Sequence, residues 1–286
     1  MKRMPLGVSR LDQLIGGGAP AGSVVLLAGE AGAGAREFCY TAAAMNGLAD
    51  RDPAQFDRYY GALESNATLP EAVHYVSITG ERSAIVDEMR LVMDDDLVAA
   101  GMDGVSVVEL AEPYFRRTPV PTEWYTDGAT DITDLGSRVG RDGGDRSDRS
   151  DVLESLGNYL SDHAADSLVV VDSITDLVAA ADDHLDWADL TVLLRGLKRA
   201  AHRWGGVVLL LVNAEALEPT ELGALKEATD GTLRFEWESG GSERARTLVV
   251  EQFRGVLSRL EDEDIVRFET EIHDGGFDIS NVRKIR

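Results

Sequence analysis

A glycine-rich turn between an apolar stretch and a helix-forming stretch is the part of this sequence best suited to chemistry. The apolar residues run from Val24 to Ala28, and the helix-forming residues run from Glu37 to Leu48. A strand, a loop of the form G-x-x-x-x-G-K-[ST] and a helix, in that order, hold phosphate through backbone N–H groups. Gly29 and Gly34 stand at the two glycine positions. The layout predicts a nucleotide phosphate site with these residues: Gly29, Glu30, Gly32, Ala33, Gly34, Ala35 and Arg36.

The two side chains that do the chemistry of such a loop are replaced. Ala35 stands where a lysine would reach the β- and γ-phosphates, and Arg36 stands where a Ser/Thr hydroxyl would hold Mg²⁺. Loss of a group that stabilises developing charge slows such reactions by a factor of about 10² to 10³. The backbone anion site needs no side chain. We therefore expect ATP and Mg²⁺ binding to be weakened by Ala35 and Arg36, and efficient hydrolysis to be absent.

The residues that lead into the loop carry a longer pattern, G-x-x-x-L-D-x-L-[IL]-G-G-G-x-P-x-G-S. Its positions are Gly7, Leu11, Asp12, Leu14, Ile15, Gly16 to Gly18, Pro20, Gly22 and Ser23. Followed at once by the loop, this pattern resembles the opening of the KaiC/RadA branch of the RecA-type ATPases. The resemblance spans the chain outside 49–72 and 112–150.

The resemblance implies roles for residues far from the loop. Asp172 ends an apolar run that matches the Walker B strand, whose aspartate helps to hold Mg²⁺, usually through water. Glu81 matches one of two adjacent glutamates, one of which acts on the attacking water; Arg82 replaces the other. Arg254 matches the arginine of a K-x-R-G motif that reaches ATP on a neighbouring subunit, and Gln252 replaces its lysine. From the residues alone, Glu81 is equally well explained as the start of a helix.

Strand-like and helix-like stretches alternate along most of the chain. Apolar residues at helical spacing between Leu190 and Trp204 precede another buried strand, Val207 to Val212. This alternation predicts an α/β fold, a RecA-like core with a mostly parallel sheet flanked by helices. Alternating residues near the end predict a C-terminal antiparallel extension. We expect a single domain, 1–286, with an insertion at 112–150 whose composition predicts disorder around 126–150.

Charge and composition limit the kinds of ligand and environment that suit this protein. The net charge is −23, which argues against direct binding of nucleic acid because phosphates must be neutralised by clustered cations. With lysine at four positions, 24 of the 28 basic residues are arginine. Abundant carboxylates predict a protein of an extreme halophile, where dense salt screens self-repulsion. The lone Cys39 and the lack of a long apolar segment predict a cytoplasmic protein without membrane contact.

Three functional hypotheses fit these observations. The first is a catalytically degenerate RecA/KaiC-type protein, regulatory or signalling, that acts through nucleotide binding and assembly. The second is an active ATPase of the KaiC/RadA type in which Arg36 substitutes for the missing groups. The third is a nucleotide-free scaffold that partners an active paralogue. The resemblance implies a homo-oligomer or a paralogous KaiC/RadA-type subunit as the partner.

Overall fold

The computed structural model describes residues 2–116, 118–126, 152–180, 187–239, 244–262 and 265–284. The stretch expected to be disordered, 126–150, lies outside these residues apart from Thr126. The described part of the 112–150 insertion contains most of a short helix, α6 (Ala111–Phe115), and one turn of 3-10 helix, η1 (Thr122–Trp124).

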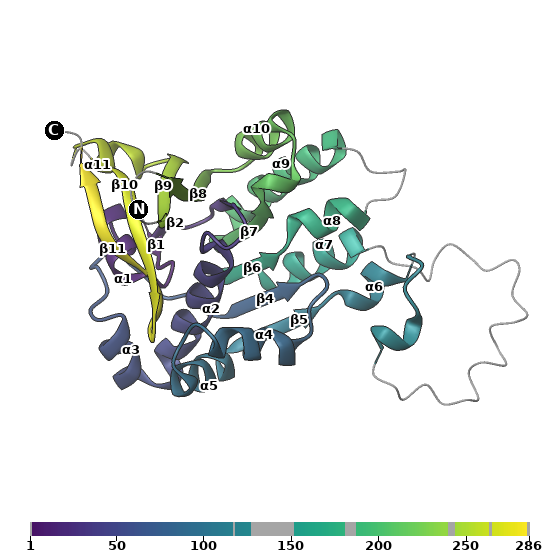
Figure 1. The fold of residues 1–286 in the computed structure, drawn as a ribbon, viewed down its shortest axis with the longest axis horizontal. Helices are drawn as coiled ribbons and strands as arrows, with labels where there is room; N and C mark the ends of the chain where they lie inside the picture. The colour runs from purple at the N-terminus through teal and green to yellow at the C-terminus, as the bar shows by residue number, and fades with distance from the viewer. Residues whose placement is uncertain are drawn as a thin grey trace, which may run out of the picture.

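Within the described residues, nine strands form one sheet in the order β11-β10-β9-β8-β3-β7-β6-β4-β5 (Figure 1). Six neighbouring strands are parallel: β3 (Val24–Gly29), β4 (Val73–Ser77), β5 (Val105–Glu109), β6 (Leu168–Asp172), β7 (Val207–Asn213) and β8 (Gly231–Ser239). Three antiparallel strands extend the sheet: β9 (Arg244–Phe253), β10 (Ile265–His273) and β11 (Gly276–Lys284). A separate small sheet pairs β1 (Arg3–Met4) with β2 (Ala19–Pro20). The predicted α/β class with an antiparallel extension is confirmed.

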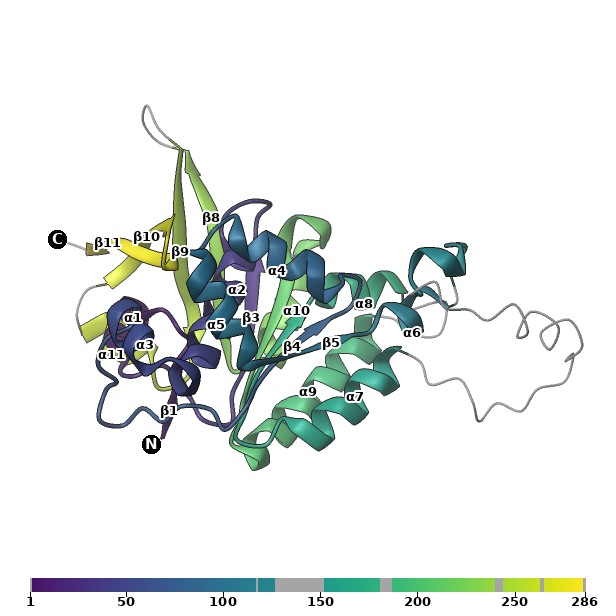
Figure 2. The same ribbon diagram turned by 90° about the horizontal axis from the view of Figure 1, so that it is seen from below.

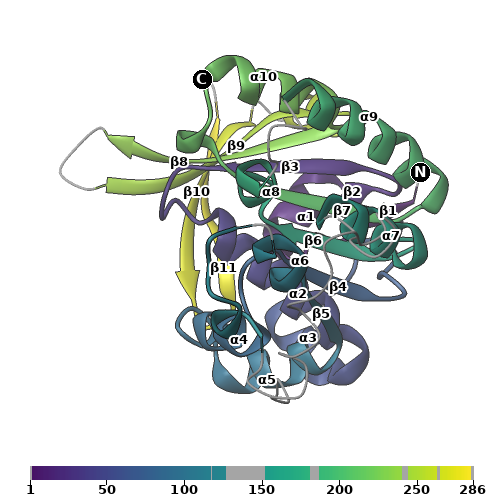
Figure 3. The ribbon, with the colours of Figure 1, turned by 90° about the vertical axis from the view of Figure 1, so that its right-hand side faces the viewer.

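Helices cover both faces of the sheet (Figures 2 and 3). One face carries α1 (Ser9–Ile15), α2 (Ala35–Arg51), α3 (Pro53–Tyr59), α4 (Arg82–Arg90), α5 (Asp95–Asp103) and α11 (Leu257–Asp262). The other carries α7 (Val152–His163), α8 (Ile174–Ala180), α9 (Trp187–Trp204) and α10 (Pro219–Ala228). Because strand residues alternate between faces, Val25 and Leu27 enter the first core and Val24, Leu26 and Ala28 the second. This burial on both sides explains why β3 is apolar throughout.

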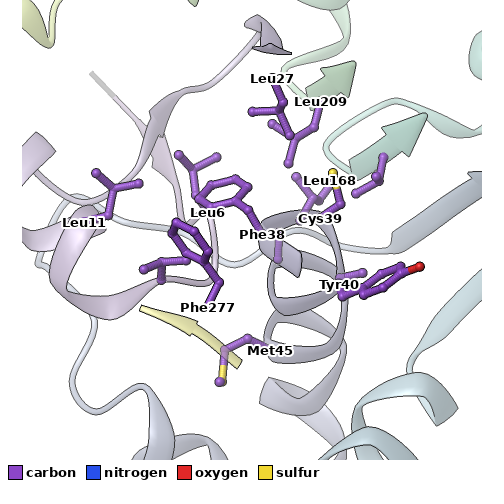
Figure 4. Close-up of a cluster of buried hydrophobic side chains, with 14 of the residues drawn as sticks. Leu6, Leu11, Leu27, Phe38, Cys39, Tyr40, Met45, Leu168, Leu209 and Phe277 are labelled. Carbon is purple, nitrogen blue, oxygen red and sulfur yellow. The ribbon is translucent and has the colours of Figure 1, made fainter. Parts of the chain in front are cut away.

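The C-terminal extension packs directly on α2, the helix that follows the glycine loop (Figure 4). The Phe38 ring lies 5.4 Å from the Phe235 ring and 5.5 Å from the Phe277 ring, measured between centroids. The Phe277 N–H donates to Thr41 Oγ1 at 2.8 Å. Cys39 is fully buried on the same helix, as its position predicts. The extension therefore fixes the helix that presents the loop.

The turn that opens the chain is built around a buried carboxylate. Asp12 accepts hydrogen bonds from the N–H groups of Leu6 and Gly7, at 2.9 and 3.0 Å, and from the Tyr60 hydroxyl at 3.0 Å. The helix α1 then ends at Gly16, whose φ of 88° lies in the left-handed region that glycine tolerates best. The aspartate of the opening pattern thus has a structural task, because it holds the segment that leads into β3.

Candidate functional site

The glycine loop lies at the carboxyl edge of the parallel strands, between β3 and α2. Gly34 has a φ of 106°, and a Cβ added there would lie 2.9 Å from the Phe277 ring. A Cβ added to Gly29 would lie 2.6 Å from the Ala35 Cβ. Both motif positions therefore require glycine for steric reasons.

The hairpin of β8 and β9 extends past this edge and holds the loop from the side. Trp237 donates twice, from its backbone N–H to Glu30 Oε2 at 2.9 Å and from its indole Nε1 to the Ala31 carbonyl at 3.0 Å. The Arg246 Nε donates to the Gly32 carbonyl at 3.0 Å, and its guanidinium lies over the Trp237 ring at 4.8 Å. Neither residue is predictable from the sequence, because no local pattern links them to a loop about 200 residues earlier.

A cavity of about 480 Å³ opens beside the loop. Its lining includes the loop, the first turn of α2, the end of β7 and part of α4. In the part of the chain that the structure describes, no protein acceptor engages the N–H groups of Gly34, Ala35 and Arg36. Three adjacent donors at the start of a 17-residue helix form a concave, positively polarised surface. Such a surface suits a phosphate group.

Arg36, which lines this cavity, forms an ion pair with Asp172 at the end of β6. The Arg36 Nη2 lies 3.1 Å from Asp172 Oδ1, and the hydroxyl of buried Tyr75 donates to Asp172 Oδ2 at 2.7 Å. The Asp172 side chain is only 9% exposed, whereas that of Arg36 is 51% exposed and lines the cavity. Partial burial is the largest single influence and lowers the pKa of Arg36, but the Asp172 carboxylate, together with Tyr40 and Tyr75, more than offsets it, so the pKa of the guanidinium is raised. Arg36 is therefore a fixed cation.

Among the described residues that line the cavity, none is a lysine. Ala35 is 6% exposed, and its methyl group faces Gly29. The charged residues that line the cavity are Glu30, Arg36, Glu37 and Glu88. Glu88 accepts a hydrogen bond from the Tyr40 hydroxyl, and burial together with this bond raises the pKa of Tyr40. Three carboxylates and one guanidinium give the cavity lining a net negative charge, which opposes additional negative charge on a ligand.

The residues present do not fit a Mg²⁺ site of the usual kind. Each Asp172 oxygen already accepts a hydrogen bond, one from Arg36 and one from Tyr75. The position of the hydroxyl ligand carries the Arg36 guanidinium, which cannot coordinate a metal. Among the described residues, no group of three or more His, Cys, Asp or Glu side chains is arranged to hold a metal ion. The role of Asp172 as a metal ligand therefore stays a prediction that this geometry does not favour.

Glu81 lies outside the loop cavity. It precedes α4 and lines a neighbouring cavity of about 610 Å³ together with Arg82 and Trp124. The Arg82 guanidinium donates to the carbonyls of Met102 and Val105, at 3.1 and 3.4 Å, so it ties α4 to the end of α5. Arg82 thus has a structural explanation. The catalytic role of Glu81 stays a prediction.

Arg254 lies at the opposite edge of the sheet from the glycine loop of its own chain. It follows Phe253, which pairs with Gly231 beside Val25, at the amino end of β3, whereas the loop follows the carboxyl end. Arg254 is exposed, and within the described residues its guanidinium has no hydrogen-bond or ion-pair partner. Gln252 is engaged, because its Nε2 donates to the Lys226 carbonyl at 2.5 Å.

The sheet order and the helices on both faces define this chain as an α/β protein with a RecA-like fold, in which the glycine loop joins β3 to α2. It is similar along its full length to the crystal structure of the flagellar accessory protein FlaH from Methanocaldococcus jannaschii, with a TM-score of 0.56, 16% sequence identity and 100% of both chains covered. At this identity the likeness shows the fold alone. No family model matches the sequence, and neither does a curated protein. In the part of the chain described, no helix is long and apolar enough to cross a membrane.

Proposed function

We propose that this chain is a RecA/KaiC-type protein that binds a nucleotide without hydrolysing it efficiently, and that it acts in regulation or signalling through binding and assembly. One observation carries the proposal. The glycine frame and its three open N–H groups are kept, while the lysine and hydroxyl positions are replaced and Arg36 lies on Asp172. ATP or ADP is the proposed ligand.

The absence of efficient hydrolysis follows from what surrounds the reacting phosphate. Ala35 supplies no charge there, and the Arg36 guanidinium is held by Asp172 at 3.1 Å. Removal of one such stabilising group lowers the rate by a factor of about 10² to 10³. Binding can use the backbone donors, which do not depend on the missing lysine and hydroxyl.

Calorimetric titration with ADP and ATP in multimolar KCl tests the proposal, with phosphate release measured on the same protein. We expect heat of binding and a raised melting temperature, without turnover above background. Turnover at the rate of an active KaiC-type ATPase that is abolished by Asp172→Asn would show that the chain is an enzyme after all.

Assembly is the second part of the proposal, with another copy or a paralogous KaiC/RadA-type chain as the partner. Its support is Arg254, an exposed cation that lies at the opposite edge of the sheet from its own loop. Light scattering with and without nucleotide measures the association. Arg254→Ala should reduce any nucleotide-dependent increase in mass, with Arg90→Ala as the control. A monomer under all conditions contradicts assembly of identical copies.

A nucleotide-free scaffold is the second candidate function, and a separate contact favours it. The Glu215 Oε2 accepts a hydrogen bond from the Ala31 N–H at 3.0 Å, so a carboxylate of the protein already lies on the loop. Absence of heat and of any change in melting temperature with either nucleotide selects this candidate over the first.

A further inference from the structure

We infer that the Arg36–Asp172 ion pair takes the place of the divalent cation, so that the loop binds the diphosphate part of a nucleotide without metal. The inference rests on the proposed nucleotide binding and names the form of ligand that the site accepts. It has two parts: binding is independent of Mg²⁺, and the γ-phosphate adds nothing to affinity.

The first part follows from the state of the Asp172 carboxylate. In an active loop site this carboxylate faces a cation. Here the cation is supplied by Arg36, with Nη2 3.1 Å from Oδ1, and Oδ2 accepts from the Tyr75 hydroxyl. Because Asp172 is nearly buried, its charge needs such a partner, and the pair satisfies it without a metal.

The Arg36 guanidinium can bind phosphate oxygens of the ligand while it keeps its ion pair with Asp172. About half of the Arg36 side chain remains accessible in the cavity, and its hydrogen bond to Asp172 is its one hydrogen bond among the described residues. A guanidinium has five N–H donors in a fixed plane and binds phosphate oxygens strongly. Arg36 also begins the same helix as the open N–H groups of Gly34 and Ala35. These groups together match a diphosphate.

The second part follows from the charges that line the cavity. Ala35 leaves the γ-position without a cation, and Glu30, Glu37 and Glu88 line the cavity. ATP carries one more negative charge than ADP, so these carboxylates oppose it, and dense salt reduces this effect without reversing it. ADP should therefore bind as tightly as ATP, or more tightly.

Titration of the full chain with ADP and with ATP, each in excess Mg²⁺ and in excess EDTA at constant KCl, tests both parts. We expect dissociation constants in Mg²⁺ and EDTA to agree within about twofold, and ADP to bind at least as tightly as ATP. A loss of affinity in EDTA of about tenfold or more overturns the inference and leaves nucleotide binding intact. Absence of binding under both conditions overturns the inference and the proposed function together.

Arg36→Thr supplies the second test, because it removes the internal cation and restores a hydroxyl. ADP binding in EDTA should weaken by about tenfold, and part of this loss should be recovered by Mg²⁺. The matched control is Arg90→Thr, since Arg90 lies 3.1 Å from Asp87 in an exposed pair outside the loop cavity. Equal effects of the two substitutions, or an Arg36→Thr protein whose binding in EDTA is unchanged, contradict the assigned role of Arg36.

Discussion

At the scale of single residues, Arg36 and Asp172 differ from an ordinary surface ion pair in their burial. The Asp172 side chain is 9% exposed, whereas both members of the Arg90–Asp87 pair, at the same 3.1 Å separation, are open to solvent. Water screens the exposed pair and leaves it worth less than about 1 kcal/mol. The buried carboxylate, in contrast, loses its charge partner when Arg36 is removed.

Double-mutant cycles on the two pairs should separate these cases. For Arg36→Thr with Asp172→Asn, we expect a coupling in the free energy of unfolding of about 1 kcal/mol or more. For Arg90→Thr with Asp87→Asn, we expect about 0.3 kcal/mol or less. Urea unfolding at constant high salt measures both. A larger coupling in the exposed pair is the opposite of what this geometry predicts.

Ala35 offers a second test of the same site. Ala35→Lys introduces a cation where the lysine of the loop motif stands, so the ratio of ATP to ADP affinity should rise about tenfold. Ala35→Met provides an uncharged side chain of similar length as the control and should leave the ratio unchanged. Titration at constant salt gives the ratio. If both variants change it equally, the effect comes from packing against Gly29 and not from charge.

At the scale of elements, the C-terminal hairpin constrains the loop through Gly34. Gly34→Ala places a Cβ 2.9 Å from the Phe277 ring at a φ of 106°, and should lower the free energy of unfolding by about 2 to 4 kcal/mol. Gly32→Ala is the matched control. Its φ is 72°, and its nearest contact would be Trp237 at 3.7 Å, so only the backbone cost of about 1 kcal/mol applies. Denaturant unfolding compares the two. Equal costs indicate that Phe277 moves away freely.

The opening turn should make stability depend on pH through Asp12. Burial raises its pKa from the usual 3.8 to about 7, although its hydrogen bonds oppose the shift. The folded chain therefore keeps a proton that the unfolded chain has released, and this contribution to the free energy of unfolding is lost as pH rises from about 4 to about 7. Asp12→Asn should flatten this slope, relative to the wild type, in urea unfolding at several pH values. A parallel shift of both curves contradicts the assignment.

Local patterns predict those elements whose partners are near in sequence or fixed by strand order. The alternation of buried strands and helices places Asp172 and Gly29 at one edge of the sheet, and the glycine spacing predicts the loop. The Arg36–Asp172 contact depends on how α2 is rotated against the sheet, and α2 is held there by Phe277, from the far end of the chain, through contacts with Thr41 and Phe38. The contacts of Trp237 and Arg246 with the glycine loop likewise depend on the length of the hairpin formed by β8 and β9. The hydrogen bond from Arg82 to the end of α5 also depends on tertiary packing. Such contacts leave no periodic signal in the sequence.

At the scale of the whole molecule, the excess of negative charge predicts that the stability of the fold depends on salt. The chain has 51 acidic and 28 basic residues. Some carboxylates are paired on the outer strands, where Glu236 meets Arg234 and Arg267 at 3.0 and 2.9 Å. Most of the excess remains uncompensated, and its mutual repulsion favours the expanded chain. At low ionic strength the repulsion extends over about 30 Å, and at molar salt over about 3 Å.

The melting temperature should therefore rise steeply with KCl, and the chain should lose its fold in dilute buffer. Circular dichroism and calorimetry along a KCl series measure this dependence. Sucrose is the control, because it also favours burial through exclusion from the surface but screens no charge; it should not replace KCl. A chain that is fully folded at low ionic strength, or one that sucrose protects as well as KCl does, is inconsistent with charge repulsion as the cause. The nucleotide titrations must accordingly be done in concentrated salt, where the carboxylates around the loop cavity are also screened most.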